Sequence, residues 1–184
     1  MKITWIQPYY DLILNEIPVD AKTILDVGAG YGIFGYIMKK ARTATISAVE
    51  PFDYPLGVYD FLFTTTWQKF HDEKNYDVIV STEMIEHMSH DDAIAFLDSA
   101  RHRAKKVIVA TPYSFERQEA YDGNQYQIHK CVVSLDDFKD NGYKTKLLGT
   151  LCFRGLVCRV YFHPRLKPLM KILGVKITNI IGVH

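Results

Sequence analysis

The sequence predicts an α/β domain built on a mostly parallel sheet, and two observations support this prediction. Short apolar runs of strand length, such as TILDV at 23–27 and YDVIVS at 76–81, alternate with segments of helical spacing. Such alternation is typical of parallel sheets, because each helix crosses back over the sheet to the next strand. The chain has 184 residues, of which 48% are apolar and 23% charged, as expected for one ordinary globular domain.

Five apolar runs have the length of buried strands, and helical patterns lie around them. The expected strands are residues 23–27, 44–49, 59–64, 76–81 and 105–111. The expected helices are residues 9–17, 31–40, 91–103 and 134–143. Ser89 suits the N-cap of the third helix, and Gly142 suits the position after the fourth. Two extended runs, 144–151 and 156–162, predict an antiparallel pair with one reversed strand near the end of the sheet.

Composition and charge narrow the class of protein. The formal net charge is +1, so RNA stays open as a partner although the overall charge does not indicate it. Three cysteines without a CxxC pair suggest a reducing compartment. The chain shows no signal-peptide pattern and no run near the roughly 18 apolar residues of a membrane span. We therefore expect a soluble cytoplasmic protein of unknown oligomeric state.

A glycine-rich loop follows the first strand. TILDVGAGYG places Gly28, Gly30 and Gly32 where glycines let the backbone turn tightly and approach a ligand. Residues 30–35 also satisfy the GxGxxG pattern of nicotinamide enzymes. Counted from Gly28, where the loop begins, the pattern fails because Ile33 replaces its third glycine.

Two acids beside this loop distinguish between ligands. Asp26, at the end of the first strand, would repel a pyrophosphate but suits a ligand that carries an ammonium group. Glu50 ends the second strand, where a carboxylate can accept both hydroxyls of a ribose. A cationic nucleoside therefore suits the loop better than a dinucleotide, and a nicotinamide-dependent oxidoreductase stays the alternative.

The segments ILDVGAGYG, AVEP and YDVIVSTEMIEHM, with the reversed strand, resemble the class I S-adenosylmethionine-dependent methyltransferases over residues 23–162. The resemblance implies a single-domain Rossmann-like methyltransferase fold with a seven-stranded, mostly parallel sheet, strand order 3-2-1-4-5-7-6 and an antiparallel last strand. It also implies that the glycine loop contacts the methionine part of S-adenosylmethionine. The acid with which the family contacts adenine is absent from FTTTWQKF, where Thr66 or Trp67 takes its place. The implied cofactor-binding residues are Asp26, Gly28, Ala29, Gly30, Tyr31, Gly32, Glu50, Pro51, Thr66, Trp67 and Ser81.

The segment STEMIEHM brings three ionisable groups together just after the fourth strand. Glu83, Glu86 and His87 stand at i, i+3 and i+4, so they share one face if the segment is helical. Ligands of open α/β sheets bind beyond the carboxyl ends of the strands, where this segment lies. Carboxylates with a histidine suit Mg²⁺, Mn²⁺ or a similar ion, and His129 offers a fourth ligand.

The ExxEH segment and the later histidine resemble a methyltransferase subgroup, the small-RNA 2′-O-methyltransferases and the ubiquinone-pathway O-methyltransferases. The resemblance implies a divalent metal held by Glu83, Glu86, His87 and His129. The chain departs from the RNA enzymes at 131–133, where those enzymes carry aromatic residues. Two alternatives stay open: His87 or His129 acts as a general base without metal, with Glu86 beside it, or all four residues are structural.

Taken together, these patterns predict an S-adenosylmethionine-dependent methyltransferase that transfers a methyl group to the oxygen of a small polar acceptor. A NAD-dependent oxidoreductase and a non-catalytic cofactor-binding module are the alternatives. The expected regions are an N-terminal helical lid (1–22), the S-adenosylmethionine-binding methyltransferase domain (23–163) and a basic, apolar C-terminal tail of helical spacing (164–184). The residues expected to face the acceptor from the long loop at 111–130 are Tyr113, Tyr121, Asn124 and Tyr126.

Overall fold

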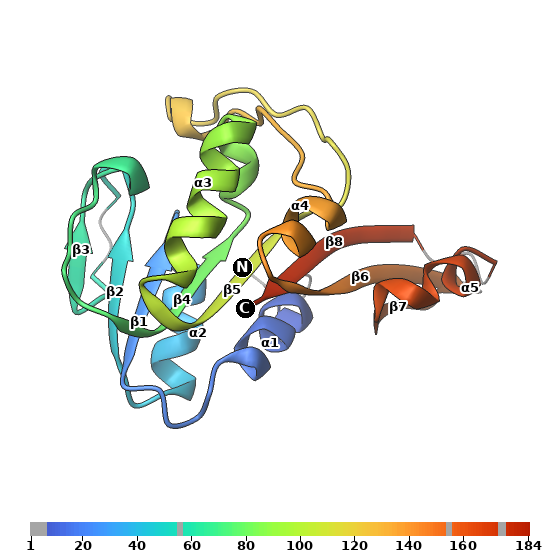
Figure 1. Cartoon of the computed structure of the whole chain (residues 1–184), viewed down its shortest axis with the longest axis horizontal. Coiled ribbons are helices and arrows are strands. Elements are labelled where there is room, and N and C mark those ends of the chain that lie inside the picture. The colour runs from blue at the N-terminus through green and yellow to red at the C-terminus, as the bar shows by residue number, and fades with distance from the viewer. Residues whose placement is uncertain (1–6, 55–56, 154–155, 173–175) are drawn as a thin grey trace.

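Eight strands form one sheet, and helices cover both of its faces (Figure 1). The computed structural model describes residues 7–54, 57–153, 156–172 and 176–184. The strands are β1 (Thr23–Val27), β2 (Thr45–Val49), β3 (Phe61–Phe63), β4 (Tyr76–Thr82), β5 (Ala104–Pro112), β6 (Lys144–Phe153), β7 (Leu156–Phe162) and β8 (Lys176–Val183). The α-helices are α1 (Gln7–Glu16), α2 (Ile33–Ala41), α3 (His90–Arg101), α4 (Leu135–Asp140) and α5 (Lys167–Ile172). The 3₁₀ turns are η1 (Trp67–Lys69), η2 (Ile85–His87), η3 (Gln125–Gln127) and η4 (Pro164–Leu166).

The order of the strands is β3-β2-β1-β4-β5-β8-β6-β7. The first five strands of this order pair in parallel, whereas β8 runs antiparallel to both β5 and β6. Without the edge strand β7, the positions follow the order 3-2-1-4-5-7-6 that the family resemblance implies, and the last strand of the chain is antiparallel as expected. The predicted α/β fold class is therefore confirmed.

The strand between β5 and β6 is not the segment that the sequence pattern assigned to it. It is β8, from the expected C-terminal tail, whereas the run 156–162 forms the edge strand β7. An interior strand is buried on both faces, and β8 supplies Ile180 and Ile181, which pack into the cores on opposite sides of the sheet.

Most other element boundaries match the sequence expectations. The five expected parallel strands correspond to β1–β5, and the four expected helices to α1–α4. Gly142 follows α4 with a φ of 80°, the left-handed conformation that suits a residue just past a helix end. The first half of the expected tail forms η4 and α5. Among the helices in the described ranges, none is long and apolar enough to span a membrane.

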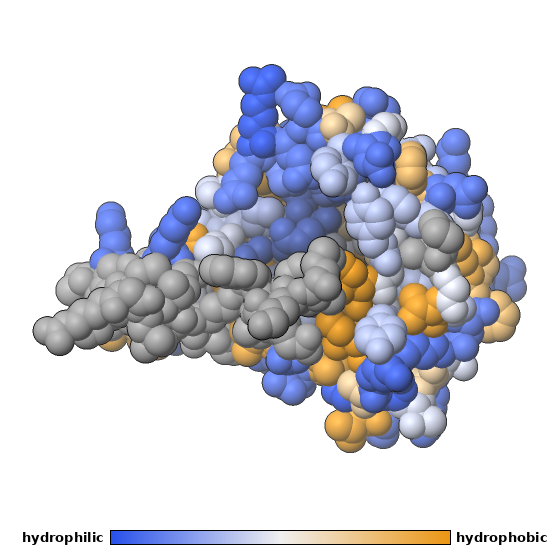
Figure 2. Space-filling model, turned by 180° about the vertical axis from the view of Figure 1, so that it is seen from behind, coloured by the Kyte–Doolittle hydropathy of each residue, from blue (hydrophilic) through white to orange (hydrophobic). Residues whose placement is uncertain are grey.

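Two hydrophobic cores lie on opposite faces of the sheet. α3 and α4 cover one face, where Phe96 and Phe138 are fully buried with Ile79 of β4. α1 and α2 cover the other face, where Ile13 and Met38 are fully buried. Seen from behind, hydrophobic residues gather in the lower central part of the surface, and hydrophilic residues predominate above them (Figure 2). The packed layers hold the carboxyl ends of β1, β2 and β4 in place.

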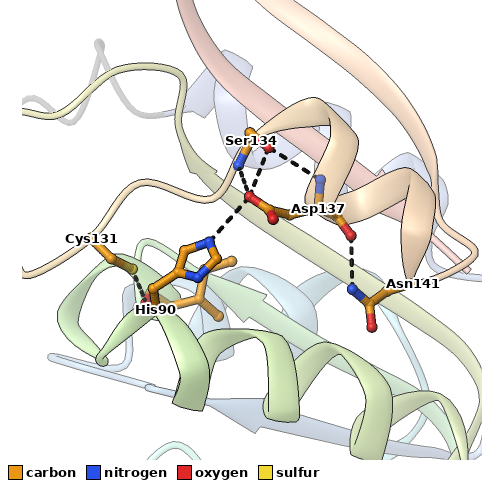
Figure 3. Close-up of polar contacts among 6 residues, drawn as sticks. His90, Cys131, Ser134, Asp137 and Asn141 are labelled. Atoms are coloured by element: carbon orange, nitrogen blue, oxygen red, sulfur yellow. Dashed lines mark hydrogen bonds and ion pairs between the residues drawn. The ribbon is translucent and has the colours of Figure 1, made fainter.

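Capping residues fix the starts of the two helices on the first face. Ser89 accepts a hydrogen bond from the backbone N–H of Asp92, as the sequence predicts for the N-cap of α3. Ser134 and Asp137 form a capping box at α4 (Figure 3). The same Asp137 carboxylate lies 3.3 Å from His90 Nε2 and thereby links the first turns of α3 and α4.

Candidate active site

A cavity of about 330 Å³ lies beyond the carboxyl ends of β1, β2 and β4. Of the residues expected to bind the cofactor, those that line the cavity are Asp26, Gly28, Ala29, Gly30, Tyr31, Glu50, Pro51, Thr66 and Trp67. Gly32 and Ser81 lie outside its lining; Ser81 is fully buried within β4. The glycine loop and the two acids are therefore brought together around one space.

Glycine is required at the first position of the loop. Gly28 has a φ of 77°, and a Cβ atom built there would lie only 2.2 Å from Met84 Cγ. Gly30 also has a positive φ, but within the described part of the chain no atom lies within 4 Å of the place where its Cβ would stand. The backbone is thus tightly packed against Met84 at one end of the loop and open at the next glycine.

Glu50 is held rigidly by two backbone amides. Its Oε2 accepts a hydrogen bond from Gly30 N–H (2.8 Å) and its Oε1 accepts one from Phe52 N–H (2.9 Å). Burial raises the pKa of this carboxyl, and the two amides partly oppose that rise. Each carboxylate oxygen can accept two hydrogen bonds, so both oxygens retain capacity for a pair of ligand hydroxyls.

Asp26 places a second buried carboxylate beside the loop. Its Oδ2 accepts a hydrogen bond from the Tyr59 hydroxyl at 2.6 Å, while its Oδ1 is buried and has no partner among the described residues. Burial raises the pKa of Asp26 to about 7, although the Tyr59 hydrogen bond lowers it. A buried carboxylate with a free oxygen is costly unless a ligand supplies a donor or a positive charge.

The STEMIEHM segment does not form the helical turn that would place its three ionisable groups on one face. Glu83 has a positive φ of 50°, and the 3₁₀ turn η2 begins only at Ile85. The Oε1 atom of Glu83 instead accepts hydrogen bonds from Tyr9 (2.5 Å) and Asn179 (3.0 Å). Glu83 is among the residues that line the cavity, and burial raises its pKa to about 7.

The other three expected metal ligands come together. Glu86, His87 and His129 each offer one ligand atom, and these atoms lie within 4.8 Å of one another. Glu86 Oε1 and His87 Nδ1 are buried without a hydrogen-bond partner among the described residues. Burial and the neighbouring His129 lower the pKa of His87, which favours its neutral, ligating form. One carboxylate and two imidazoles fit a divalent metal, and Glu86 and His87 each offer it an unpartnered buried atom, whereas Glu83 lies outside this group.

Backbone contacts bring His129 to this position from a distant part of the chain. The Glu86 carbonyl oxygen accepts hydrogen bonds from Lys130 N–H (2.8 Å) and Cys131 N–H (3.2 Å). The Cys131 thiol also donates to the Ile85 carbonyl oxygen at 3.5 Å (Figure 3). The segment that carries His129 is therefore fixed alongside η2.

The long loop contributes differently from the sequence expectation. Tyr126 lines the cavity, together with Gln127 and Lys130, whereas Tyr113 and Tyr121 do not. Asn124 is fully buried and structural: it donates to the Tyr54 hydroxyl at 3.0 Å and accepts from the Tyr126 backbone N–H.

Sequence patterns missed two apolar parts of the lining. Met84 and Met88 lie on the cavity, but methionines next to acids give no signal that separates a lining residue from a core residue. Phe34 also lines it, stacked on Tyr10 with ring centroids 4.9 Å apart. Tyr10 belongs to α1, within the expected N-terminal lid, and the role of a lid stays a prediction.

Comparisons with known proteins point to one family. The model of the family described as "Methyltransferase domain" matches residues 5–141, and no curated protein matches the chain. Among solved structures, a SAM dependent methyltransferase from Archaeoglobus fulgidus is similar with 11% identity and a TM-score of 0.64, covering 96% of this chain and 92% of that one. Magnesium protoporphyrin IX methyltransferase from Synechocystis PCC 6803, solved with bound SAM, has 13% identity and a TM-score of 0.55, covering 97% and 78%.

A cyclopropane synthase from Mycobacterium tuberculosis is also similar, with 15% identity and a TM-score of 0.59 over 77% of this chain. This chain spans only 62% of the length of that synthase. At such low identities these structures establish the fold alone. The family match, by contrast, extends over well more than half of the sequence, and the chain therefore belongs to the methyltransferase domain family.

Proposed function

We propose that this protein is an S-adenosylmethionine-dependent methyltransferase that methylates an oxygen of a small polar acceptor. The observation that carries the proposal is the convergence of two buried carboxylates, Asp26 and Glu50, on the cavity beside an open glycine loop. S-adenosylmethionine is a nucleoside with an ammonium group and a ribose diol. Asp26 Oδ1 suits the ammonium group and Glu50 suits the diol, while Thr66 and Trp67 offer a surface for the adenine.

The proposed reaction is an in-line displacement at the methyl carbon. A bond forms between the acceptor oxygen and the methyl carbon, the sulfur–methyl bond breaks, and its electron pair stays on sulfur to give S-adenosylhomocysteine. The acceptor hydroxyl loses its proton, so a base must be close to it. Without a metal, His87 is a suitable base, because it lines the cavity and its lowered pKa keeps it neutral near pH 7. If His87 ligates a metal, Glu83, which also lines the cavity, is left to accept the proton.

Within this proposal, Glu86, His87 and His129 hold a divalent ion such as Mn²⁺ or Mg²⁺. The support is the pair of buried unpartnered atoms, Glu86 Oε1 and His87 Nδ1, within a cluster of ligand atoms no more than 4.8 Å apart. When bound, such an ion would lower the pKa of an acceptor hydroxyl. Thr111 donates to Glu86 Oε2 at 3.0 Å and orients the carboxylate, so that its other oxygen is free to ligate.

Release of S-adenosylhomocysteine, measured over a panel of hydroxyl and amine acceptors, tests the proposed function. Turnover with hydroxyl acceptors is expected, with loss of activity in chelator and recovery with Mn²⁺ or Mg²⁺. Full activity of Glu86→Gln in chelator would exclude the metal but leave methyl transfer standing. Cofactor binding without turnover on any acceptor would favour a binding module, and binding of NADH instead of S-adenosylhomocysteine would favour an oxidoreductase.

A further inference from the structure

We propose that Tyr59 is a positioning residue for the cofactor: its hydroxyl holds one oxygen of Asp26, so that the other oxygen is directed at the amino group of S-adenosylmethionine. This inference rests on the proposed function and adds a residue that no part of the glycine loop or the sequence motifs indicates. Tyr59 lies outside the cavity lining and would act only through Asp26.

The hydrogen-bond geometry separates the two oxygens of Asp26. The Tyr59 hydroxyl donates to Oδ2 at 2.6 Å, which is short for a hydrogen bond between oxygens and typical of a charged acceptor. Oδ1 is buried, lacks a partner among the described residues, and belongs to a residue on the cavity lining. One oxygen is thus occupied by the protein and the other is left for a ligand.

A glycine in α2 makes this contact sterically feasible. A Cβ atom built on Gly35 would lie 2.3 Å from Cζ of Tyr59 and 2.4 Å from its hydroxyl oxygen. Any larger residue at 35 would push the ring away from Asp26. Gly35 is the last glycine of the pattern that resembles a dinucleotide fingerprint, in which that position allows close packing of the helix on the strand; here it admits a tyrosine ring.

Protonation states agree with the donor role. Burial, followed by the charge of Asp26, raises the pKa of Tyr59, so its hydroxyl keeps its proton. Burial is the main influence that raises the pKa of Asp26, and Glu50 adds to the rise. The hydrogen bond from Tyr59 lowers the pKa of Asp26 and so opposes both effects. It thereby favours the ionised carboxylate, which is the form that attracts an ammonium group.

The test compares Tyr59→Phe with the wild type in calorimetric titrations with two nucleosides. S-adenosylhomocysteine carries the amino-acid group, and 5′-methylthioadenosine lacks it. Loss of one hydrogen bond to a charged group is expected to weaken S-adenosylhomocysteine binding about tenfold. Binding of 5′-methylthioadenosine should change less than about twofold, since it does not reach Asp26. Tyr36→Phe is the matched control, because Tyr36 lies in α2 next to Gly35, does not contact Asp26 in any described hydrogen bond, and is 58% exposed.

Two further variants make the test specific. In an Asp26→Asn background, Tyr59→Phe should have little additional effect on the affinity for S-adenosylhomocysteine, because Tyr59 acts on the ligand only through the Asp26 carboxylate. Gly35→Ala displaces the ring without removing the hydroxyl and should produce the same selective loss, which covers the case in which Tyr59→Phe folds poorly.

Equal affinity of Tyr59→Phe and wild type for S-adenosylhomocysteine would overturn the inference and leave the proposed function intact. Equal weakening of both nucleosides would also overturn it, because that result indicates a packing role. If the wild type bound neither nucleoside, the proposed function itself would fail and the inference with it.

Discussion

The side chain of Met84 occupies the space directly beside Gly28, where any other residue would place its Cβ atom. The two residues belong to the loops after β1 and β4, so the glycine loop is packed against the segment that carries Glu83 and Glu86. The loop of the proposed cofactor site and the segment with the proposed catalytic groups are therefore in direct contact. A change in one loop should affect the other.

Replacement of Gly28 by alanine should destabilise the protein. A left-handed backbone costs a non-glycine residue roughly 1–2 kcal/mol, and forced overlap in a packed site costs roughly 1–3 kcal/mol more. We expect a loss of about 2–5 kcal/mol in the free energy of unfolding, measured by urea denaturation. Gly57→Ala is the control, since no atom of the described residues lies within 4 Å of its added Cβ. Equal stability of both variants would contradict the Gly28–Met84 packing.

Replacement of Glu50 by glutamine should weaken the binding of the cofactor while leaving the fold intact. The amide group retains the shape of the carboxylate, but its NH₂ would face one of the two backbone donors and lose acceptor capacity. The dissociation constant for S-adenosylhomocysteine should rise by about 10–100-fold. Asp53→Asn, at an exposed acid three residues further on, should leave it unchanged. A rise below twofold for Glu50→Gln would argue against ribose binding at this position.

Replacement of Arg103 by lysine should loosen the surface proposed for adenine. The Arg103 guanidinium lies 4.8 Å from the ring centroids of both Trp67 and Phe70, and its Nη2 donates to the Asp72 carbonyl oxygen at 2.7 Å. Lysine keeps the charge but not the planar stacking. We therefore expect the free energy of unfolding, measured by thermal denaturation, to fall by about 1–2 kcal/mol. Arg101→Lys, which affects only an exposed pair with Asp98, should change stability by less than about 0.5 kcal/mol.

Raised carboxyl pKa values should make the unliganded protein less stable at higher pH. Burial raises the pKa of Asp26 and of Glu83 to about 7, so the folded protein retains protons that the unfolded chain releases near pH 4. The free energy of unfolding should therefore fall as the pH rises from about 4 to about 7 through these groups.

The contribution of Asp26 to this pH dependence can be isolated with Asp26→Asn. The variant cannot ionise at this position. Its free energy of unfolding, relative to that of the wild type, should therefore be higher at pH 8 than at pH 5, by on the order of 2–4 kcal/mol. The lowered pKa of His87 acts in the opposite direction, but it is common to both proteins and cancels in the comparison. A difference that does not depend on pH would contradict the buried, raised-pKa state of Asp26.

The sequence could predict much of the scaffold because its signals are local. The apolar run at 76–81, the N-cap at Ser89 and the loop from Gly28 each depend on neighbouring residues, and all are found where expected. The position of β8 could not be predicted in this way, because the run 156–162 is also strand-like, and the order of the strands is set only when the sheet assembles.

The sequence could predict the candidate site only where the backbone follows regular secondary structure. The i, i+3, i+4 spacing placed Glu83 with Glu86 on the assumption of a helix, and the positive φ of Glu83 breaks that relationship. The Tyr59–Asp26 contact joins residues 33 positions apart across a glycine of α2, and no pattern of residue types signals it. Such contacts depend on which side chains meet after the sheet has formed.

Calorimetric titration of S-adenosylhomocysteine into the wild type and into an Asp26→Asn, Glu50→Gln double variant tests the central claim most directly. We predict saturable binding at one site in the wild type and no measurable binding in a double variant that retains the fold. Unaltered affinity in the double variant, or no binding by the wild type, would contradict the claim that these two carboxylates hold a cationic nucleoside beside the glycine loop.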